Sequence, residues 1–286
     1  MEKLQVLQTK FTTNKYINDI YKIMASEEYA KLEGKTQVFL NHAHGVSNRQ
    51  SHTIQVRNSA VTIGSALGAN TALCAAGALG HDLGHTPFGH SGERAIQQFV
   101  PDFEHCKQSY EIAKKMHLNK RVQDAILNHR SSGCPSTLEG KIVQIADKTA
   151  YLVHDYEDCL RLGMNLKLPT IVTRLLGCTP KRIQETLLSD LITTTRNTGT
   201  LQHSELITSA KNEMRTYMFE AVYQNQTVKY DEPEAENIIV TLFKHYQKTM
   251  NTTDIINKIV NMTDYDAIRA YRVITGKSTI LSVYYQ

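Results

Sequence analysis

The sequence predicts an all-α protein, and three observations support this fold class. Apolar residues recur three or four positions apart, as in the series His52, Val56, Ala60, Ile63 and Leu67, which places them on one face of a helix. Glycine, proline and asparagine punctuate the chain between such stretches. No long alternation of apolar and polar residues predicts a sheet, and residues 35–40 are the single candidate for a short strand.

Helices are expected in the first half of the chain wherever this spacing persists between breakers. They cover residues 15–31, 52–67, 71–82, 91–99, 106–116 and 120–129. The second helix ends at Gly68, the third before Pro87, the fourth before Pro101 and the last before Gly133. Glycine frees the backbone and proline removes an amide donor, so both interrupt helices.

The second half follows the same pattern. The expected helices cover residues 138–160, 179–194, 204–223, 234–250 and 263–273, with breaks at 163–165 and at Pro233. No fixed repeat and no long linker separates them. We therefore expect residues 1–286 to form a single compact domain, with a core over about 35–165 and a helical extension over about 166–286 packed on that core.

Composition places the chain among ordinary globular proteins. Its 286 residues are 41% hydrophobic and 21% charged, which argues against wholesale disorder. There are 32 Lys and Arg against 28 Asp and Glu, a net charge of +4. That charge suits an anionic small ligand as well as nucleic acid, and no basic run of the kind found in nucleic-acid tails is present.

The expected location is cytoplasmic, without membrane contact. The start of the chain lacks the apolar run of a signal peptide, and no stretch approaches the roughly 18 consecutive apolar residues of a membrane span. The five cysteines are scattered, odd in number and without a C-x-x-C pair. They are interpreted as reduced thiols.

The strongest chemical signal lies between residues 78 and 93. Seven of the 12 histidines fall between positions 42 and 105, and this segment contains His81, His85 and His90. His81 and Asp82 offer an imidazole and a carboxylate side by side, a donor pair that suits divalent ions but needs further ligands. Glu93 follows His90 by one helical turn and can orient its imidazole. Packing and stability alone do not explain so many histidine and carboxylate side chains interleaved with glycines. We therefore interpret the segment as functional.

Two other helices supply candidates that would complete a metal site. His52 lies on the apolar face of its helix, with Arg49 three residues earlier on the same side. Asp147, Tyr151 and Asp155 recur at four-residue spacing beside another apolar face. Each also has a structural explanation as a core histidine, a solvated helix start or a salt-bridged helix edge. The incomplete His-Asp pair is the reason to favour metal ligation.

Together these segments resemble the HD superfamily of metal-dependent phosphohydrolases, and more narrowly the bacterial deoxyguanosinetriphosphate triphosphohydrolase (dGTPase) family. The similar segments are Arg49-Gln-Ser-His52, Gly80 to Glu93, Phe103-Glu-His105 and Leu138 to Tyr151. The resemblance extends over roughly residues 15–275. It implies a helical HD-domain phosphohydrolase fold with a C-terminal helical extension.

The resemblance also implies a role for individual positions. One divalent ion (Mn²⁺, Mg²⁺, Fe²⁺, Co²⁺ or Zn²⁺) would be held at the HD site, and a second Mg²⁺ could accompany the triphosphate. The expected metal ligands are His52, His81, Asp82 and Asp147. The expected catalytic residues are His90, Glu93, His85 and His105. The expected substrate contacts are Arg49, Lys148, Tyr151, Asp155 and Gln37.

Within that scheme, His90 oriented by Glu93 would be the acid–base or nucleophilic histidine near the α-phosphorus. His85 and His105 would hold or protonate the phosphate chain. Asp155 would accept a hydrogen bond from the deoxyribose 3′-hydroxyl. Lys148 would contact phosphate, although a lysine at this position is also compatible with simple solvation.

The implied reaction is hydrolysis of a deoxynucleoside triphosphate, dGTP first, to a deoxynucleoside and tripolyphosphate. A triphosphate carries about four negative charges, so its hydrolysis depends on charge neutralisation by a metal and by cationic groups. The alternatives are an HD-domain 5′-deoxynucleotidase, a phosphodiesterase, or a non-catalytic module that binds nucleotide or single-stranded nucleic acid. A complete ligand set and an intact His90 favour catalysis. A homo-oligomer is expected.

Overall fold

The computed structural model confirms the all-α prediction. It describes residues 15–40 and 45–283, and within those ranges it contains no strand. The prediction of a short strand at 35–40 is therefore wrong. An isolated antiparallel bridge joins Thr36 to Asn48 in this segment. The backbone carbonyl oxygens of Thr36 and Gln37 instead accept hydrogen bonds from the Arg49 side chain.

The helices lie close to the expected positions, with three additions. Their bounds are α2 Lys15–Met24, α3 Glu27–Lys31, η1 Leu32–Gly34, α4 Arg49–Leu67, α5 Thr71–Gly80, α6 Gly89–Gln97, α7 His105–Lys115, α8 Lys120–Leu127, α9 Leu138–Arg161, α10 Thr170–Leu175, α11 Pro180–Thr198, α12 Glu205–Met218, η2 Phe219–Tyr223, α13 Gln226–Lys229, α14 Glu232–Tyr246, α15 Thr252–Val260, α16 Asp264–Thr275 and η3 Ile280–Val283. The pattern missed α10, α13 and α15. The helix expected over 15–31 is split, because Ser26 accepts a hydrogen bond from the amide of Tyr29 and starts α3 anew.

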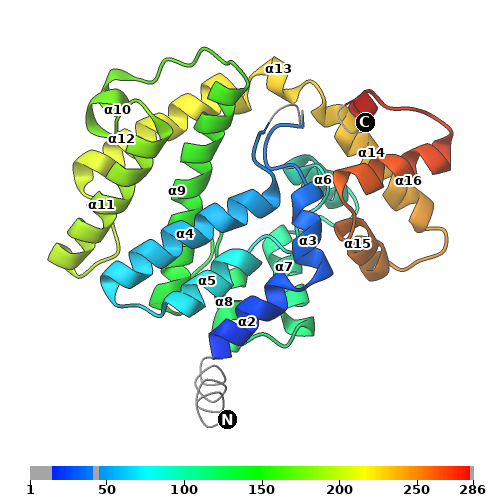
Figure 1. Ribbon diagram of the computed structural model, residues 1–286. Coiled ribbons are helices and arrows are strands. Elements are labelled where there is room, and N and C mark those ends of the chain that lie inside the picture. Colours follow the sequence, from blue (N-terminus) through cyan, green and yellow to red (C-terminus); the bar gives the residue numbers. More distant parts are fainter. Residues whose placement is uncertain (1–14, 41–44, 284–286) are drawn as a thin grey trace, which may run out of the picture.

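Helix α9 is the long central element (Figure 1). It begins at the N-cap Thr137, whose hydroxyl accepts from the amide of Gly140. Helices α10, α11 and α12 lie on one side of it in Figure 1, and α14, α15 and α16 lie at the opposite end of the molecule. Helix α4 crosses α9 and also packs on α5. Helices α4, α5 and α8 therefore all pack against α9.

The core is divided into three apolar clusters. One joins α2 and α5–α8 to α14–α16, with Ile23, Ile126 and Phe243 fully buried. A second lies among α9–α12, and the third fills the space between α4, α5 and α9. The described residues form no helix long and apolar enough to cross a membrane.

Close backbone approaches shape the segment between α5 and α7. A Cβ atom at Gly84 would lie 2.3 Å from the amide nitrogen of Ser109, and one at Gly92 would lie 2.1 Å from the carbonyl oxygen of Pro87. Only glycine fits at either position. Phe88, between them, has φ 60° and starts α6 from the left-handed region. This tight path turns the chain so that histidines from both sides of Pro87 face one another.

The buried carboxylate of Asp264 ties this path to two distant segments. It accepts hydrogen bonds from the amide of Phe88 (2.8 Å), the amide of Thr36 (2.9 Å) and the Thr36 hydroxyl (2.5 Å). Beside it, the Lys35 ammonium donates to the carbonyl oxygens of His85 and Val260. Burial lowers the pKa of Lys35 to about 7. The start of α16 thus helps to hold the histidine-rich segment in place.

Replacing Asp264 with alanine should lower the free energy of unfolding by about 3 kcal/mol, because it leaves buried amide and hydroxyl donors without an acceptor. Urea denaturation monitored by circular dichroism measures this loss. Asp102→Ala, at an exposed carboxylate, is the matched control and should change stability by less than about 0.5 kcal/mol. Equal effects of the two substitutions would contradict a structural role for Asp264.

Candidate active site

The four predicted metal ligands come together from three helices. His52 lies on α4, His81 and Asp82 directly follow α5, and Asp147 lies on α9. His52 Nε2 is 3.0 Å from Asp147 Oδ1, and His81 Nε2 is 3.6 Å from Asp82 Oδ1 and 3.8 Å from Asp147 Oδ1. Donor atoms bonded to one ion at about 2.1 Å lie about 3.0–3.5 Å apart. The spacing is close to that of a formed coordination shell.

The tautomer of His81 gives independent support for a cation. Its Nδ1 lies 2.6 Å from the carbonyl oxygen of Ala78, which can only accept, so Nδ1 carries the hydrogen of the neutral ring. The lone pair of His81 Nε2 then faces the carboxylates of Asp82 and Asp147. Such an arrangement is repulsive unless Nε2 is also protonated or a cation lies among the three groups. The donor set of two imidazoles and two carboxylates therefore fits a divalent ion.

Arg49 holds Asp82 in its ionised form. The Arg49 Nη1 donates to Asp82 Oδ2 at 3.0 Å, and both side chains are buried. Burial by itself would raise the pKa of Asp82, but the charge that the His81 imidazole carries when protonated and the Arg49 guanidinium hold that pKa well below its usual value. Because Oδ2 is occupied, Oδ1 is the oxygen that faces the histidines. Arg49, predicted as a substrate contact, lines the pocket while its guanidinium is largely used within the protein.

The predicted catalytic residues form a second group next to the predicted metal ligands. Glu93 accepts from His90 Nδ1 at 3.0 Å, from His105 Nδ1 at 3.2 Å and from the His105 amide. Burial would raise the pKa of Glu93, but its bonds to His105 and His90 place it well below the usual range. His85 stacks on His105 at 4.4 Å between ring centroids. Neither ring nitrogen of this fully buried His85 has a hydrogen-bond partner among the described residues.

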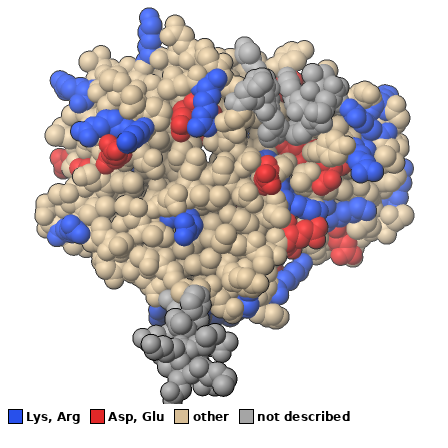
Figure 2. All heavy atoms as spheres, viewed as in Figure 1, with Lys and Arg blue, Asp and Glu red and all other residues tan. Residues whose placement is uncertain are grey.

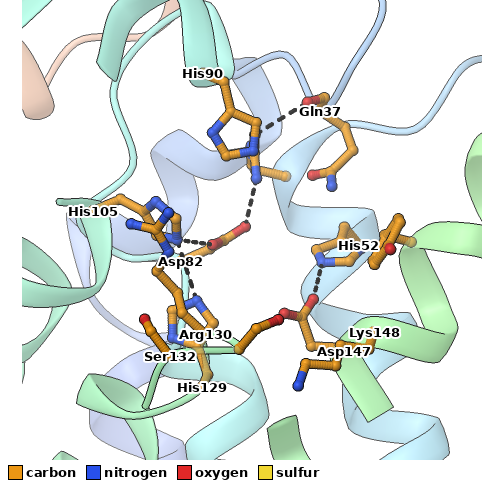
Figure 3. A pocket seen from close by; sticks show the side chains of 13 residues that line it. Gln37, His52, Asp82, His90, His105, His129, Arg130, Ser132, Asp147 and Lys148 are labelled. Carbon is orange, nitrogen blue, oxygen red and sulfur yellow. Dashed lines mark hydrogen bonds and ion pairs between the residues drawn. The ribbon is translucent and has the colours of Figure 1, made fainter. Parts of the chain in front are cut away.

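Both groups face one open cavity of about 380 Å³ (Figure 3). Its lining includes the predicted residues Gln37, Arg49, His52, Asp82, His90, His105, Asp147, Lys148 and Tyr151. His81 and His85 lie behind this surface. Three cationic side chains line the cavity, those of Arg49, Arg130 and Lys148. The cavity therefore combines the predicted metal ligands with positively charged side chains.

A second cavity of about 610 Å³ adjoins the first and shares Gln37, His90 and Tyr151 with it. The predicted Asp155 lies here, and its Oδ2 accepts a short hydrogen bond from the Tyr223 hydroxyl. Asp155 Oδ1 is buried without a hydrogen-bond partner among the described residues. Burial raises the pKa of Asp155 to about 7. An acceptor thus lies in the wall of this second cavity, ready for a ligand hydroxyl.

Sequence reasoning missed three residues of the site. His129 lines the first cavity, and its Nε2 lies 3.2 Å from His105 Nε2. Arg130 follows it and lies 3.9 Å from both Glu93 and Glu104. Tyr223 ends the π-helical turn η2 and joins Asp155. His129 and Arg130 follow the end of α8, which was their only distinguishing feature in the sequence. The fold is needed to show that this end of α8 faces the predicted metal ligands.

Comparisons with known proteins agree with this geometry. The HD domain family matches residues 49–152. A deoxyguanosinetriphosphate triphosphohydrolase-like protein of Caldanaerobacter subterraneus is 38% identical over 237 residues, covering 79% of this chain and 70% of the relative. A protein of the same name from Clostridium perfringens strain 13 is 33% identical over 251 residues, covering 81% and 73% respectively.

One solved structure supports the fold at lower sequence similarity. A hypothetical protein from Aquifex aeolicus superposes with a TM-score of 0.58 at 19% identity. The match covers 90% of this chain and 69% of the other. At that identity the likeness concerns the arrangement of helices alone.

The raised pKa of Asp155 predicts a distinct pH dependence of stability. Because its folded pKa is about 7 and its unfolded value about 4, the carboxyl binds a proton more tightly when folded. Its contribution is present below pH 4 and lost as the pH rises through 7. Wild type should therefore lose a few kcal/mol relative to Asp155→Asn between pH 5 and 8, at about 1.4 kcal/mol per pH unit. Chemical denaturation of both proteins at each pH measures the difference, and a constant offset would contradict it.

Proposed function

Because the chain belongs to the HD-domain family of deoxyguanosinetriphosphate triphosphohydrolase-like proteins, we propose that it hydrolyses deoxynucleoside triphosphates, dGTP first among them. The family membership makes it a metal-dependent phosphohydrolase. The proposal adds the substrate class and the bond that is cleaved. Cleavage falls at the α-phosphorus and releases a deoxynucleoside and tripolyphosphate.

The carrying observation is that two adjoining cavities meet at His90. The first contains the metal ligands and cationic groups, and suits a polyphosphate. The second contains Asp155 and Tyr223, and at about 610 Å³ it has room for a nucleoside. The α-phosphate joins these two halves of a nucleotide. A substrate that fills both cavities therefore has its α-phosphorus near His90.

The side chains of this chain supply binding and proton transfer. His90 carries a hydrogen on Nδ1 for Glu93, which leaves Nε2 to take or give a proton at the bridging oxygen. Its side chain is 60% exposed, so a substrate can reach it. A divalent ion held by His52, His81, Asp82 and Asp147 would polarise the phosphoryl group. Lys148 and Tyr151, which line the first cavity, would neutralise and orient the phosphates.

The sugar would be recognised by Asp155. Its free Oδ1 can accept a hydrogen bond from the 3′-hydroxyl, while Tyr223 fixes the other oxygen. Tyr151 and Gln37 line both cavities and would contact the substrate where phosphate and sugar meet. A buried acceptor without a partner is costly, and a substrate hydroxyl would satisfy it.

The competing activities fit the site less well. A 5′-deoxynucleotidase needs to hold one phosphate, and a cavity of about 380 Å³ bordered by several cations is larger than that task requires. Binding of a nucleic-acid strand would favour a continuous basic track. On the face shown in Figure 2, Lys and Arg side chains instead form small separate groups interspersed with Asp and Glu.

Incubation with each dNTP and Mn²⁺ should release tripolyphosphate and deoxynucleoside in equal amounts. Separation of products by ion-exchange chromatography distinguishes this from stepwise loss of single phosphates. Matched reactions with a dNMP and with a dinucleotide test the two alternative activities. Orthophosphate or pyrophosphate as the first product would overturn the proposed cleavage position.

Asp147→Asn should abolish turnover and lower metal occupancy, because it removes a charged ligand with almost no change of shape. Metal content by mass spectrometry and product formation measure the two effects. Glu157→Gln, on the same helix and paired with Arg161 at the surface, is the control and should leave both unchanged. Full turnover by Asp147→Asn would exclude Asp147 from the metal site.

A further inference from the structure

Three charged side chains form a network in the wall of the second cavity. Arg94 on α6 donates from Nε to Glu236 Oε1 and from Nη2 to Glu232 Oε2, each at 2.7 Å. The two glutamates lie one turn apart on α14, which packs beside α6 (Figure 1). All three residues line the second cavity and none lines the first. The network therefore belongs to the part of the joined space that contains no predicted metal ligand.

The network leaves some of its hydrogen-bonding atoms unused. Arg94 Nε and Nη2 are engaged, since Nη2 also donates to the Ser91 hydroxyl at 3.0 Å. Among the described residues, Arg94 Nη1, Glu232 Oε1 and Glu236 Oε2 have no hydrogen-bond partner. The three side chains are 45%, 30% and 28% exposed, so a ligand in the cavity can approach them. The network thus offers one donor group and two acceptors.

The rest of the cavity suits a flat ring attached to a polar sugar. Phe219 lines the cavity and is exposed, and Val38 and Val228 line it too. A planar base can stack on an aromatic side chain of this kind. Asp155 is 2% exposed and lines the same cavity, and its Oδ1 has no partner among the described residues. This buried acceptor marks the cavity as a ligand site independently of the charged network.

The unused atoms match the hydrogen-bonding edge of one base. Guanine presents an acceptor, O6, followed by two donors, the N1 hydrogen and the 2-amino group. Adenine presents a donor beside an acceptor, cytosine a donor beside two acceptors, and thymine a donor between two acceptors. Two carboxylate oxygens beside one guanidinium donor are therefore complementary to guanine. Each of the other bases would leave at least one carboxylate oxygen without a donor, which is costly.

Charge favours the same orientation of a nucleotide. The network carries one negative charge in total, because two carboxylates surround one guanidinium. Lys229 is the further cation in the described lining of the second cavity, so this cavity has no excess of positive charge. Three cations line the first cavity. The polyphosphate is therefore attracted to the first cavity, and the uncharged base is left for the second.

We propose that Arg94, Glu232 and Glu236 recognise the edge of a guanine base and determine which deoxynucleoside triphosphate is preferred. Arg94 Nη1 donates to O6, and the two carboxylates accept from N1 and from the 2-amino group. The ring packs against Phe219. The inference rests on the proposed hydrolysis of deoxynucleoside triphosphates and assigns the residues that choose among them. The preference comes from the buried polar groups that a wrong base would leave unpaired.

The wild-type protein tests the base pattern without any substitution. Rates of tripolyphosphate release with Mn²⁺ should give a kcat/KM for dGTP about tenfold or more above those for dATP, dCTP and dTTP. The analogue dITP lacks only the 2-amino group, and its kcat/KM should fall about tenfold below that of dGTP. Equal values for dGTP and dITP, or a preference for another base, would overturn the proposal.

Glu232→Gln and Glu236→Gln then test the residues themselves. Each should lower the ratio of kcat/KM for dGTP to that for dTTP about tenfold, because an anionic acceptor becomes a neutral amide. Glu234→Gln removes the same charge from the first turn of α14 at a residue that does not line the cavity, and should keep the wild-type ratio. If the first two variants also keep that ratio, the network only joins α6 to α14 and the proposal is wrong.

Binding of deoxynucleosides separates a failure of this inference from a failure of the proposed function. Calorimetric titration with deoxyguanosine, deoxyadenosine and thymidine involves no phosphate and no cleavage. Tightest binding of deoxyguanosine, weakened in Glu232→Gln, without any release of tripolyphosphate from dNTPs would support this inference and contradict the proposed reaction. Release of tripolyphosphate from every dNTP at equal efficiency, with no preference among the deoxynucleosides, would do the reverse.

Discussion

The burial of the Asp82 carboxylate is the constraint on which the site depends. A carboxylate that is 2% exposed stays ionised only if positive charge surrounds it. Arg49 provides a fixed part of that charge through Asp82 Oδ2, and in turn binds the carbonyl oxygens of Thr36 and Gln37. The remaining oxygen, Oδ1, faces lone pairs of neighbouring histidines. Arg49 thus binds one oxygen of this carboxylate, and the other oxygen remains available for the divalent ion proposed above.

The side chains predicted to hold a metal lie together in the structure, and sequence could single them out because their spacing is local or follows a helical period. His81 and Asp82 are adjacent, and Asp147 begins a row with Tyr151 and Asp155 that the structure places along two joined cavities. His129 could not be found in this way. It has no motif around it, and its position beside Asp82 depends on how α8 packs against α5 and α9. Contacts between helices far apart in sequence leave no periodic signal.

The fold was predicted at the level of helices and missed at their interruptions. Apolar spacing located the long elements, since one buried face is enough to produce it. It did not show that α2 and α3 are separate, because that break comes from a single hydroxyl at Ser26. It also passed over the π-helical turn Phe219–Tyr223, which directs Tyr223 toward Asp155. Each of these features involves an individual side-chain hydrogen bond. The spacing of apolar residues along the sequence contains no information about such bonds.

The position of Asp264 shows that the segment matched by the HD domain family depends on residues outside it. The segment matched by the HD domain family runs from 49 to 152, yet the turn at Phe88 is anchored from outside it by Asp264, and the carbonyl of His85 by Lys35. A fragment cut at those family boundaries would retain every predicted metal ligand but lose the hydrogen bonds that position the segment carrying His85 and His90. The residues that match the family and the residues that hold the site in place are therefore not the same set. Transfer of residues 49–152 to another protein would also require replacements for the hydrogen bonds of Asp264 and Lys35.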